Sequence, residues 1–160
     1  TARCPLRGGP AGVSRDAARQ PTPETIHATS VAIDGGAVVI TGASGSGKSG
    51  LALELIALGA RLISDDLTRI EPGAEGWPHA ATTGRMAGVI EARGVGLLHV
   101  PHVARAPVCL IVDLDRTEQA RLPEPVTRVV LGQAIPAVAR VDSPHFAASI
   151  LALSKGGRVT

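Results

Sequence analysis

A chain of 160 residues is long enough for one domain and short for two. Hydrophobic residues reach 44% but aromatic residues only 1%, so the core must be aliphatic; this favours buried parallel strands and excludes the aromatic platforms that bind single-stranded nucleic acid. A net charge of +2 with dispersed arginines is too small for a nucleic-acid-binding surface.

Residues 1–23 are rich in proline and glycine and have no hydrophobic period, so we expect a flexible arm there and one folded domain over 24–160. The sequence shows no signal-peptide core and no transmembrane segment. No membrane partner is therefore predicted, and the cytoplasm is the default compartment.

The first half of the chain predicts a strand hairpin followed by a helix. The strands span 27–33 and 37–41, because aliphatic residues run on both sides of the turn signal at 34–36. Leucines at helical spacing predict a helix over 49–58, and we expect Gly59 to end it.

The second half of the chain predicts mainly strands, of which 106–114 is the clearest buried one. The full set of strands is predicted over 61–64, 67–70, 106–114, 126–131 and 134–140. Residues 94–100 are an aliphatic segment broken by glycines, residues 83–92 show no clear pattern, and 144–153 predict a final helix. Together these elements predict an α/β fold with a mixed sheet flanked by helices.

Eight residues between the second predicted strand and the first helix match the phosphate-binding pattern GxxxxGK[ST]. They are Gly42, Ala43, Ser44, Gly45, Ser46, Gly47, Lys48 and Ser49. The glycines let backbone N–H groups converge on phosphate oxygens, and the following helix points its positive end at the same anion. Lys48 is placed to reach the β- and γ-phosphates, and Ser49 to ligate Mg²⁺. The pattern therefore predicts binding of ATP or a similar nucleoside triphosphate.

Two acidic sites compete for the role of metal or proton partner beside this loop. Asp65 and Asp66 directly follow the predicted strand 61–64, where one carboxylate could take a proton and the other could orient it or hold a metal-bound water. Asp113 ends the aliphatic run 110–112, which is the pattern of a Walker B strand. Spacing alone leaves the choice between these sites open.

The glycine loop, the acidic pair and the segment 90–100, which contains E-x-R-G-x-G, together resemble the HPr kinase/phosphorylase family. The resemblance covers about residues 25–155 and includes the spacing of the motifs: His27 lies 21 residues before Lys48, Asp66 lies 18 after it, and Glu91 lies a further 25 on. The Pro/Gly-rich arm in place of an N-terminal domain resembles the short family members, which consist of the catalytic domain alone.

The resemblance implies a P-loop kinase domain that uses ATP and Mg²⁺ to phosphorylate a serine of an HPr-type phosphocarrier in a bacterial phosphotransferase system. Lys48 would stabilise the transferring phosphoryl group, and Ser49 and Glu91 would hold Mg²⁺, so the resemblance favours Glu91 over Asp113. Asp66 would accept the proton of the substrate serine.

The family also suggests supporting residues and an assembly. His27 would assist by hydrogen bonding to the acidic pair, including Asp65, and Arg121 is the match for a further family arginine. Family members are often hexamers, so a homo-oligomer is possible on this basis. The family also runs the reverse reaction with phosphate; the corresponding loop at 135–142 has Arg140 as its only base, which leaves the phosphorylase activity open.

Two other classes of protein fit the glycine loop alone. A small-molecule P-loop kinase commonly carries an arginine-rich lid, and the arginines here are dispersed. A nucleotide-sensing module without turnover would make Asp65 and Asp66 dispensable. The protein kinase is the favoured interpretation because its motifs form a complete catalytic set.

Overall fold

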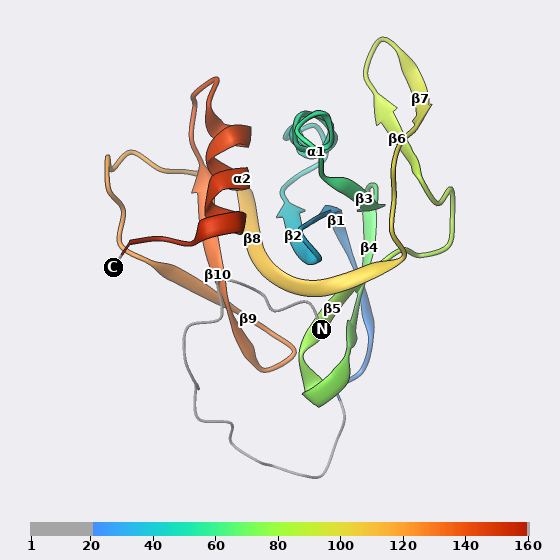
Figure 1. The fold of residues 1–160 in the computed structure, drawn as a ribbon, viewed down its shortest axis with the longest axis horizontal. Coiled ribbons are helices and arrows are strands. Elements are labelled where there is room, and N and C mark those ends of the chain that lie inside the picture. Colours follow the sequence, from blue (N-terminus) through green and yellow to red (C-terminus); the bar gives the residue numbers. More distant parts are fainter. Residues whose placement is uncertain (1–20, 160) are drawn as a thin grey trace.

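The structure is a computed structural model that describes residues 21–159. The arm predicted over 1–23 thus lies almost wholly outside the described residues, and the first strand begins directly after it. Figure 1 shows the elements in chain order: β1 (Glu24–Ile33), β2 (Gly36–Thr41), α1 (Lys48–Ala57), β3 (Arg61–Ser64), β4 (Leu67–Pro72), the 3-10 turn η1 (Ala74–Gly76), β5 (Pro78–Ala81), β6 (Val89–Ala92), β7 (Gly96–His99), β8 (Arg105–Thr117), β9 (Val126–Val130), β10 (Gln133–Arg140) and α2 (Phe146–Gly156).

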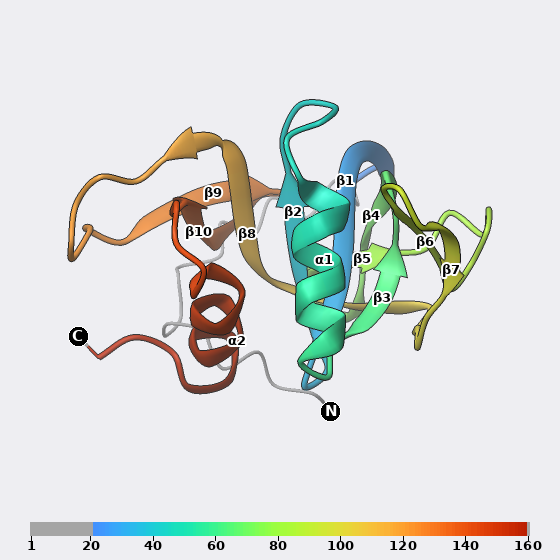
Figure 2. The same cartoon turned by 90° about the horizontal axis from the view of Figure 1, so that it is seen from above.

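The main sheet places its strands in the order β3-β1-β2-β8-β10-β9. β2 pairs with β1 in antiparallel fashion and with β8 in parallel fashion, and β8 is also parallel to β10. Both helices lie on the same side of this sheet (Figure 2), with α1 packed against β1 and β2 and in contact with α2. The predicted α/β class with a mixed sheet is confirmed.

The two longest strands each take part in two layers. β1 pairs with β4 through its first half and with β2 through its second half, while β8 pairs first with β5 and then with β2. Because β4 also pairs with β5, the strands β1, β4, β5, β8 and β2 form a closed ring. Long strands that bend in this way bury both their faces, which explains why their sequences are aliphatic runs and not alternating patterns.

Two apolar clusters make up the core. One lies between the helices and the sheet and includes Ile40, Leu55 and Leu110, each 0% exposed. The other lies on the opposite side of the sheet and includes Ile70 and Ile135. The described helices have 10 and 11 residues, and none in this part of the chain has the length and apolar character needed to cross a bilayer.

Three strands in the stretch after residue 70 were not predicted: β5, and the antiparallel pair β6 and β7, where the sequence showed no clear pattern or only a glycine-broken aliphatic segment. β5 has the sequence PHAA, which offers neither β-branched residues nor alternation, so its own residues give no strand signal. Pairing with β4 and β8 holds it as a strand. The indole N–H of Trp77, just before β5, donates to the Val108 carbonyl oxygen at 2.9 Å and helps dock the segment on β8.

Gly59 ends α1 as predicted, and its conformation gives a stability test. Its φ is +106°, and the Gly59 and Ala60 amides donate to the Ile56 and Leu55 carbonyls in a Schellman motif, both at 3.0 Å. Because an L side chain is strained in the left-handed region, Gly59→Ala should lower the free energy of unfolding by about 1–2 kcal/mol. Urea titration followed by circular dichroism measures this.

The matched control is Gly50→Ala in the same helix. Gly50 has no positive φ, and open space surrounds the position of its missing Cβ. Alanine there should raise the free energy of unfolding by about 0.5–1 kcal/mol, because glycine is a poor helix former. A change of the same sign in both variants would contradict the assignment of Gly59 as the helix end.

Candidate active site

The glycine loop, residues 42–49, connects the buried strand β2 to the first turn of α1. A Cβ on Gly42 would lie 2.6 Å from the Ser46 hydroxyl oxygen, so only glycine lets the loop close on itself here. Helix α1 has no side-chain cap and no acidic residue in its first turn. Its free N–H groups and positive dipole end therefore face the loop, which is the arrangement that binds an anion.

Lys48 is a buried cation at the loop. It is 8% exposed, and its Nζ donates to the Gly42 carbonyl at 2.8 Å and to the Ala43 carbonyl at 3.1 Å. These carbonyls hold the ammonium group against the loop that the phosphates are expected to enter. A short side-chain movement from this position would exchange carbonyl oxygens for phosphate oxygens.

Asp65 joins three elements at the start of α1. Its Oδ1 accepts hydrogen bonds from the Ser49 hydroxyl at 2.7 Å and from the Thr29 hydroxyl of β1 at 3.0 Å. Its Oδ2 accepts from the Glu91 backbone N–H of β6 at 3.1 Å. The structure therefore brings the acidic pair to the serine of the glycine loop and to the E-x-R-G-x-G segment.

Asp66 differs from its neighbour because its carboxylate makes no hydrogen bond or ion pair with a described residue. Its backbone is in the left-handed region, with φ of +65°, and its N–H donates to the Thr29 hydroxyl at 3.2 Å. The side chain is exposed and lines an open cavity of about 270 Å³ together with Asp65 and Glu91. An unpaired carboxylate in an open cavity is able to accept a proton from an incoming hydroxyl.

Oxygen-bearing side chains from three segments lie near the loop: the Ser49 hydroxyl bonds to the Asp65 carboxylate, and Glu91 lines the same cavity as Asp65. Within residues 21–159, no three His, Cys, Asp or Glu side chains converge closely enough to cage a metal ion. Mg²⁺ prefers hard oxygen donors and is usually held by one or two carboxylates, waters and substrate phosphates. These residues fit Mg²⁺ that arrives with a nucleotide.

His27 and Arg121 are not brought to hydrogen-bonding distance of this centre. His27 is exposed on β1, where it pairs in register with Leu67, and it makes no side-chain hydrogen bond to the acidic pair. Thr29, two residues further along the same strand, makes the contacts expected of His27. Arg121 is exposed in the loop between β8 and β9 and makes no side-chain contact of this kind with a described residue.

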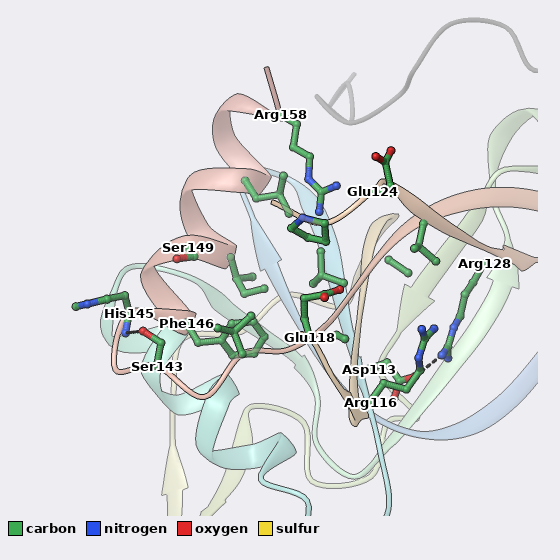
Figure 3. Close-up of a pocket in the computed structure, with 18 residues that line it drawn as sticks. Asp113, Arg116, Glu118, Glu124, Arg128, Ser143, His145, Phe146, Ser149 and Arg158 are labelled. Atoms are coloured by element: carbon green, nitrogen blue, oxygen red, sulfur yellow. Dashed lines mark hydrogen bonds and ion pairs between the residues drawn. The ribbon is translucent and has the colours of Figure 1, made fainter. Parts of the chain in front are cut away.

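Asp113 is engaged away from the acidic pair. Its Oδ1 accepts from the Asp115 N–H at 2.9 Å, and its Oδ2 is paired with the Arg128 guanidinium (Figure 3). Asp115 in turn accepts from the Ala43 N–H at 2.9 Å and so fixes the first turn of the glycine loop. In this arrangement Asp65, and not Asp113, is the carboxylate that contacts Ser49.

Arg140 is a loop contact that the motifs did not indicate. This residue ends β10, and its guanidinium donates to the Ser46 carbonyl oxygen of the glycine loop. A Cβ on Gly47 would lie 3.8 Å from the same guanidinium nitrogen. Arg140 therefore brings a positive charge to the side of the loop opposite the acidic pair.

A model of the family described as HPr Serine kinase C-terminal domain matches residues 20–130. The chain belongs to the HPr serine kinase C-terminal domain family. In this HPr serine kinase domain, the match spans β1 to β9 with the glycine loop, the acidic pair and Glu91, whereas β10 and α2 lie beyond its last residue.

Individual relatives carry related names. The "HPr kinase/phosphorylase" of Aromatoleum aromaticum is 34% identical over 121 residues, which are 68% of this chain and 39% of that protein. The "HPr kinase/phosphorylase" of Clostridium tetani is 42% identical over 80 residues, 49% of this chain and 26% of that protein. The chain thus spans well under half the length of these curated relatives.

A solved structure extends the similarity to the whole fold. The "Hpr(Ser) kinase/phosphatase from Coxiella burnetii" is similar with a TM-score of 0.68 at 25% sequence identity. The similarity covers 81% of this chain and 87% of that one. The HPr serine kinase domain therefore shares its overall architecture with that protein over most of its length.

Proposed function

We propose that this domain is a P-loop kinase that transfers the γ-phosphoryl group of ATP to a serine of an HPr-type phosphocarrier protein in the cytoplasm. The observation that supports this proposal most is that the two aspartates of the acidic pair have different surroundings. Asp65 is bonded to Ser49, the expected Mg²⁺ ligand, while the adjacent Asp66 is unpaired in an open cavity. Phosphoryl transfer to a hydroxyl needs such a base next to the phosphate site.

In the proposed reaction, the residues of the chain mainly position the phosphates and the substrate serine and neutralise the charge of the phosphates. Bound Mg²⁺ supplies charge neutralisation on the phosphates. The glycine-loop amides and Lys48 hold the β- and γ-phosphates, and Ser49, Asp65 and Glu91 supply oxygen donors toward the metal. The substrate serine oxygen bonds to the γ-phosphorus, its proton passes to Asp66, and the bond to the β,γ-bridging oxygen breaks to release ADP.

The reverse reaction, in which phosphate removes the phosphoryl group, is a second candidate. It is favoured by Arg140, the only base of residues 135–142, because its guanidinium lies against the glycine loop where an inorganic phosphate is expected to bind. In that direction an oxygen of inorganic phosphate would bond to the phosphorus, the bond to the serine oxygen would break, Asp66 would return the proton to that oxygen, and pyrophosphate would leave. A homo-oligomer stays a prediction from the family resemblance.

A transfer assay tests the proposed function. The chain is mixed with Mg-ATP and the HPr-type protein of the same cell, and the mass and modified residue of the carrier are followed by mass spectrometry. We expect one added phosphoryl group on a serine, and we expect excess phosphate with ADP removed to reverse it. Intact ATP binding without transfer to the carrier would contradict the proposal and favour a small-molecule acceptor or a nucleotide sensor.

A further inference from the structure

A cavity of about 320 Å³ lies beside α2 and shares no lining residue with the cavity of the acidic pair (Figure 3). Phe146, Ile150 and Leu153 line it from α2, and Val138 and Val141 line it from β10 and the turn that follows. Phe146 is the only phenylalanine of the chain, and it is partly exposed here. A mostly apolar cavity of this size is typical of a small-molecule site.

The cavity adjoins the glycine loop through two strands. Asp113, which lines it, pairs in register with Thr41, the last residue of β2 before the loop. Arg140 contacts the loop carbonyl of Ser46, and the chain neighbours of Arg140 on both sides line the cavity. The cavity thus begins about two strand spacings, roughly 10 Å, from the loop.

The glycine loop lies between this cavity and the acidic pair. The relevant strands of the sheet lie in the order β3-β1-β2-β8-β10, and the glycine loop follows the central strand β2. The acidic pair follows β3, on one side of β2. The cavity covers the ends of β8 and β10, on the other side of β2. Figure 1 shows the same order, with α1 between β3 and α2. A nucleotide with its γ-phosphate toward Asp66 therefore has its nucleoside end toward the cavity.

We propose that this cavity binds the nucleoside part of ATP, so that the adenine ring packs between α2 and the end of β10. The proposal rests on the proposed function only in taking ATP as the ligand. In this placement the ribose lies at the ends of β8 and β10, and the apolar side chains of α2 and β10 receive the base.

The polar groups of the cavity suit a base and a ribose. Figure 3 shows the Glu118 carboxylate and the Arg158 guanidinium at its walls, with Arg116 on the side of Asp113. An arginine guanidinium stacks on aromatic rings, and a carboxylate accepts hydrogen bonds from an exocyclic amine or ribose hydroxyls. Ser143, three residues after Arg140, also lines the cavity, and its hydroxyl accepts a hydrogen bond from the His145 N–H at 3.1 Å.

The test separates the nucleoside from the phosphates. Mg-ATP and Mg-tripolyphosphate, which is the phosphate chain without the nucleoside, are titrated calorimetrically into the chain and into Ser149→Phe. Ser149 is exposed on α2 and lines the cavity, so the added ring fills the space with little effect on the core. Ala148→Phe is the matched control, because Ala148 is exposed on the same helix and does not line the cavity.

We expect Ser149→Phe to weaken ATP binding about tenfold or more, as for loss of one stacked base, and to leave tripolyphosphate binding unchanged. Ala148→Phe should change neither affinity. Equal losses for both ligands, or no loss of ATP affinity, would overturn the proposal. A shift in oligomeric state without an effect on ATP would assign the cavity to a second copy of the chain and overturn it as well.

A second measurement needs no variant. In a methyl-labelled sample of the unchanged chain, Mg-ATP should shift the NMR signals of Ile150 and Leu153, and Mg-tripolyphosphate should leave them in place. Signals that respond equally to both ligands, or to neither, contradict the nucleoside site. Because no acceptor protein is present, these results do not depend on whether the chain phosphorylates a carrier. The nucleoside site and the proposed kinase function can therefore be contradicted independently of each other.

Discussion

Replacing Asp66 with asparagine should lower the rate of serine phosphorylation by roughly 10²–10⁴-fold, which is the usual contribution of a general base. Nucleotide affinity should change little, because the Asp66 carboxylate bonds to no described residue and Asp65 supplies the contact to Ser49. Asparagine also accepts the left-handed backbone that Asp66 adopts, with φ of +65°. Single-turnover phosphorylation with saturating Mg-ATP measures the chemical step.

Asp34→Asn is the matched control for this substitution. Asp34 is also an exposed aspartate in the left-handed region, with φ of +48°, but it lies in the turn between β1 and β2. This variant should phosphorylate at the rate of the unchanged chain. Turnover that survives in Asp66→Asn would show that another group takes the proton, and Asp65 would be the next residue to test.

Lys48→Met should weaken ATP binding about 10–100-fold and slow the transfer step by a further 10²–10³-fold. The side chain keeps its length and buried stem but loses the charge that the Gly42 and Ala43 carbonyls now hold at the loop. Because charge on the γ-phosphoryl group is redistributed during transfer, the ammonium is expected to act on both the bound ligand and the transition state. Calorimetry and single-turnover rates separate these contributions.

The only other lysine of the chain provides the control. Lys155 is exposed near the end of α2, where its contact with Asp34 is long, at 3.9 Å. Lys155→Met removes the same charge from the chain, so it corrects for any general electrostatic attraction of ATP. Equal effects of the two substitutions would mean that Lys48 has no special role.

The elements that could be predicted from sequence are those with strong local signals. β3 spans the predicted residues Arg61–Ser64, and α1 stops just before Gly59, whose positive φ ends the helix. The hairpin of β1 and β2 also follows its turn signal. β5 could not be predicted, because its pairing with β4 and β8 depends on the ring and not on its own residues.

The spacing of the motifs placed Ser49, Asp65, Asp66 and Glu91 in one region, and the structure brings them together. Their partners could be recognised only in part. Thr29 lies two residues after His27 and therefore on the same side of the strand. This spacing could have indicated Thr29 as a partner of the acidic pair.

The contacts of Arg140 with Ser46 and of Arg128 with Asp113 join residues 94 and 15 positions apart. Such distant contacts carry no local pattern. The family resemblance pointed to Arg140 as the only base of 135–142 but not to its partner, and nothing pointed to Arg128, so only the arrangement of the strands reveals which carboxylate or carbonyl each one contacts.

The pairing of β1 with three other strands has a consequence for how this site tolerates substitutions. One strand hydrogen-bonds to β2, which leads into the glycine loop, to β3, which leads into the acidic pair, and to β4, which leaves it. The distance between the glycine loop and the acidic pair is therefore set by main-chain hydrogen bonds, which do not depend on the identity of the side chains. Substitutions in the exposed loops near the acidic pair should therefore leave that distance unchanged as long as β1 keeps its pairings with these strands.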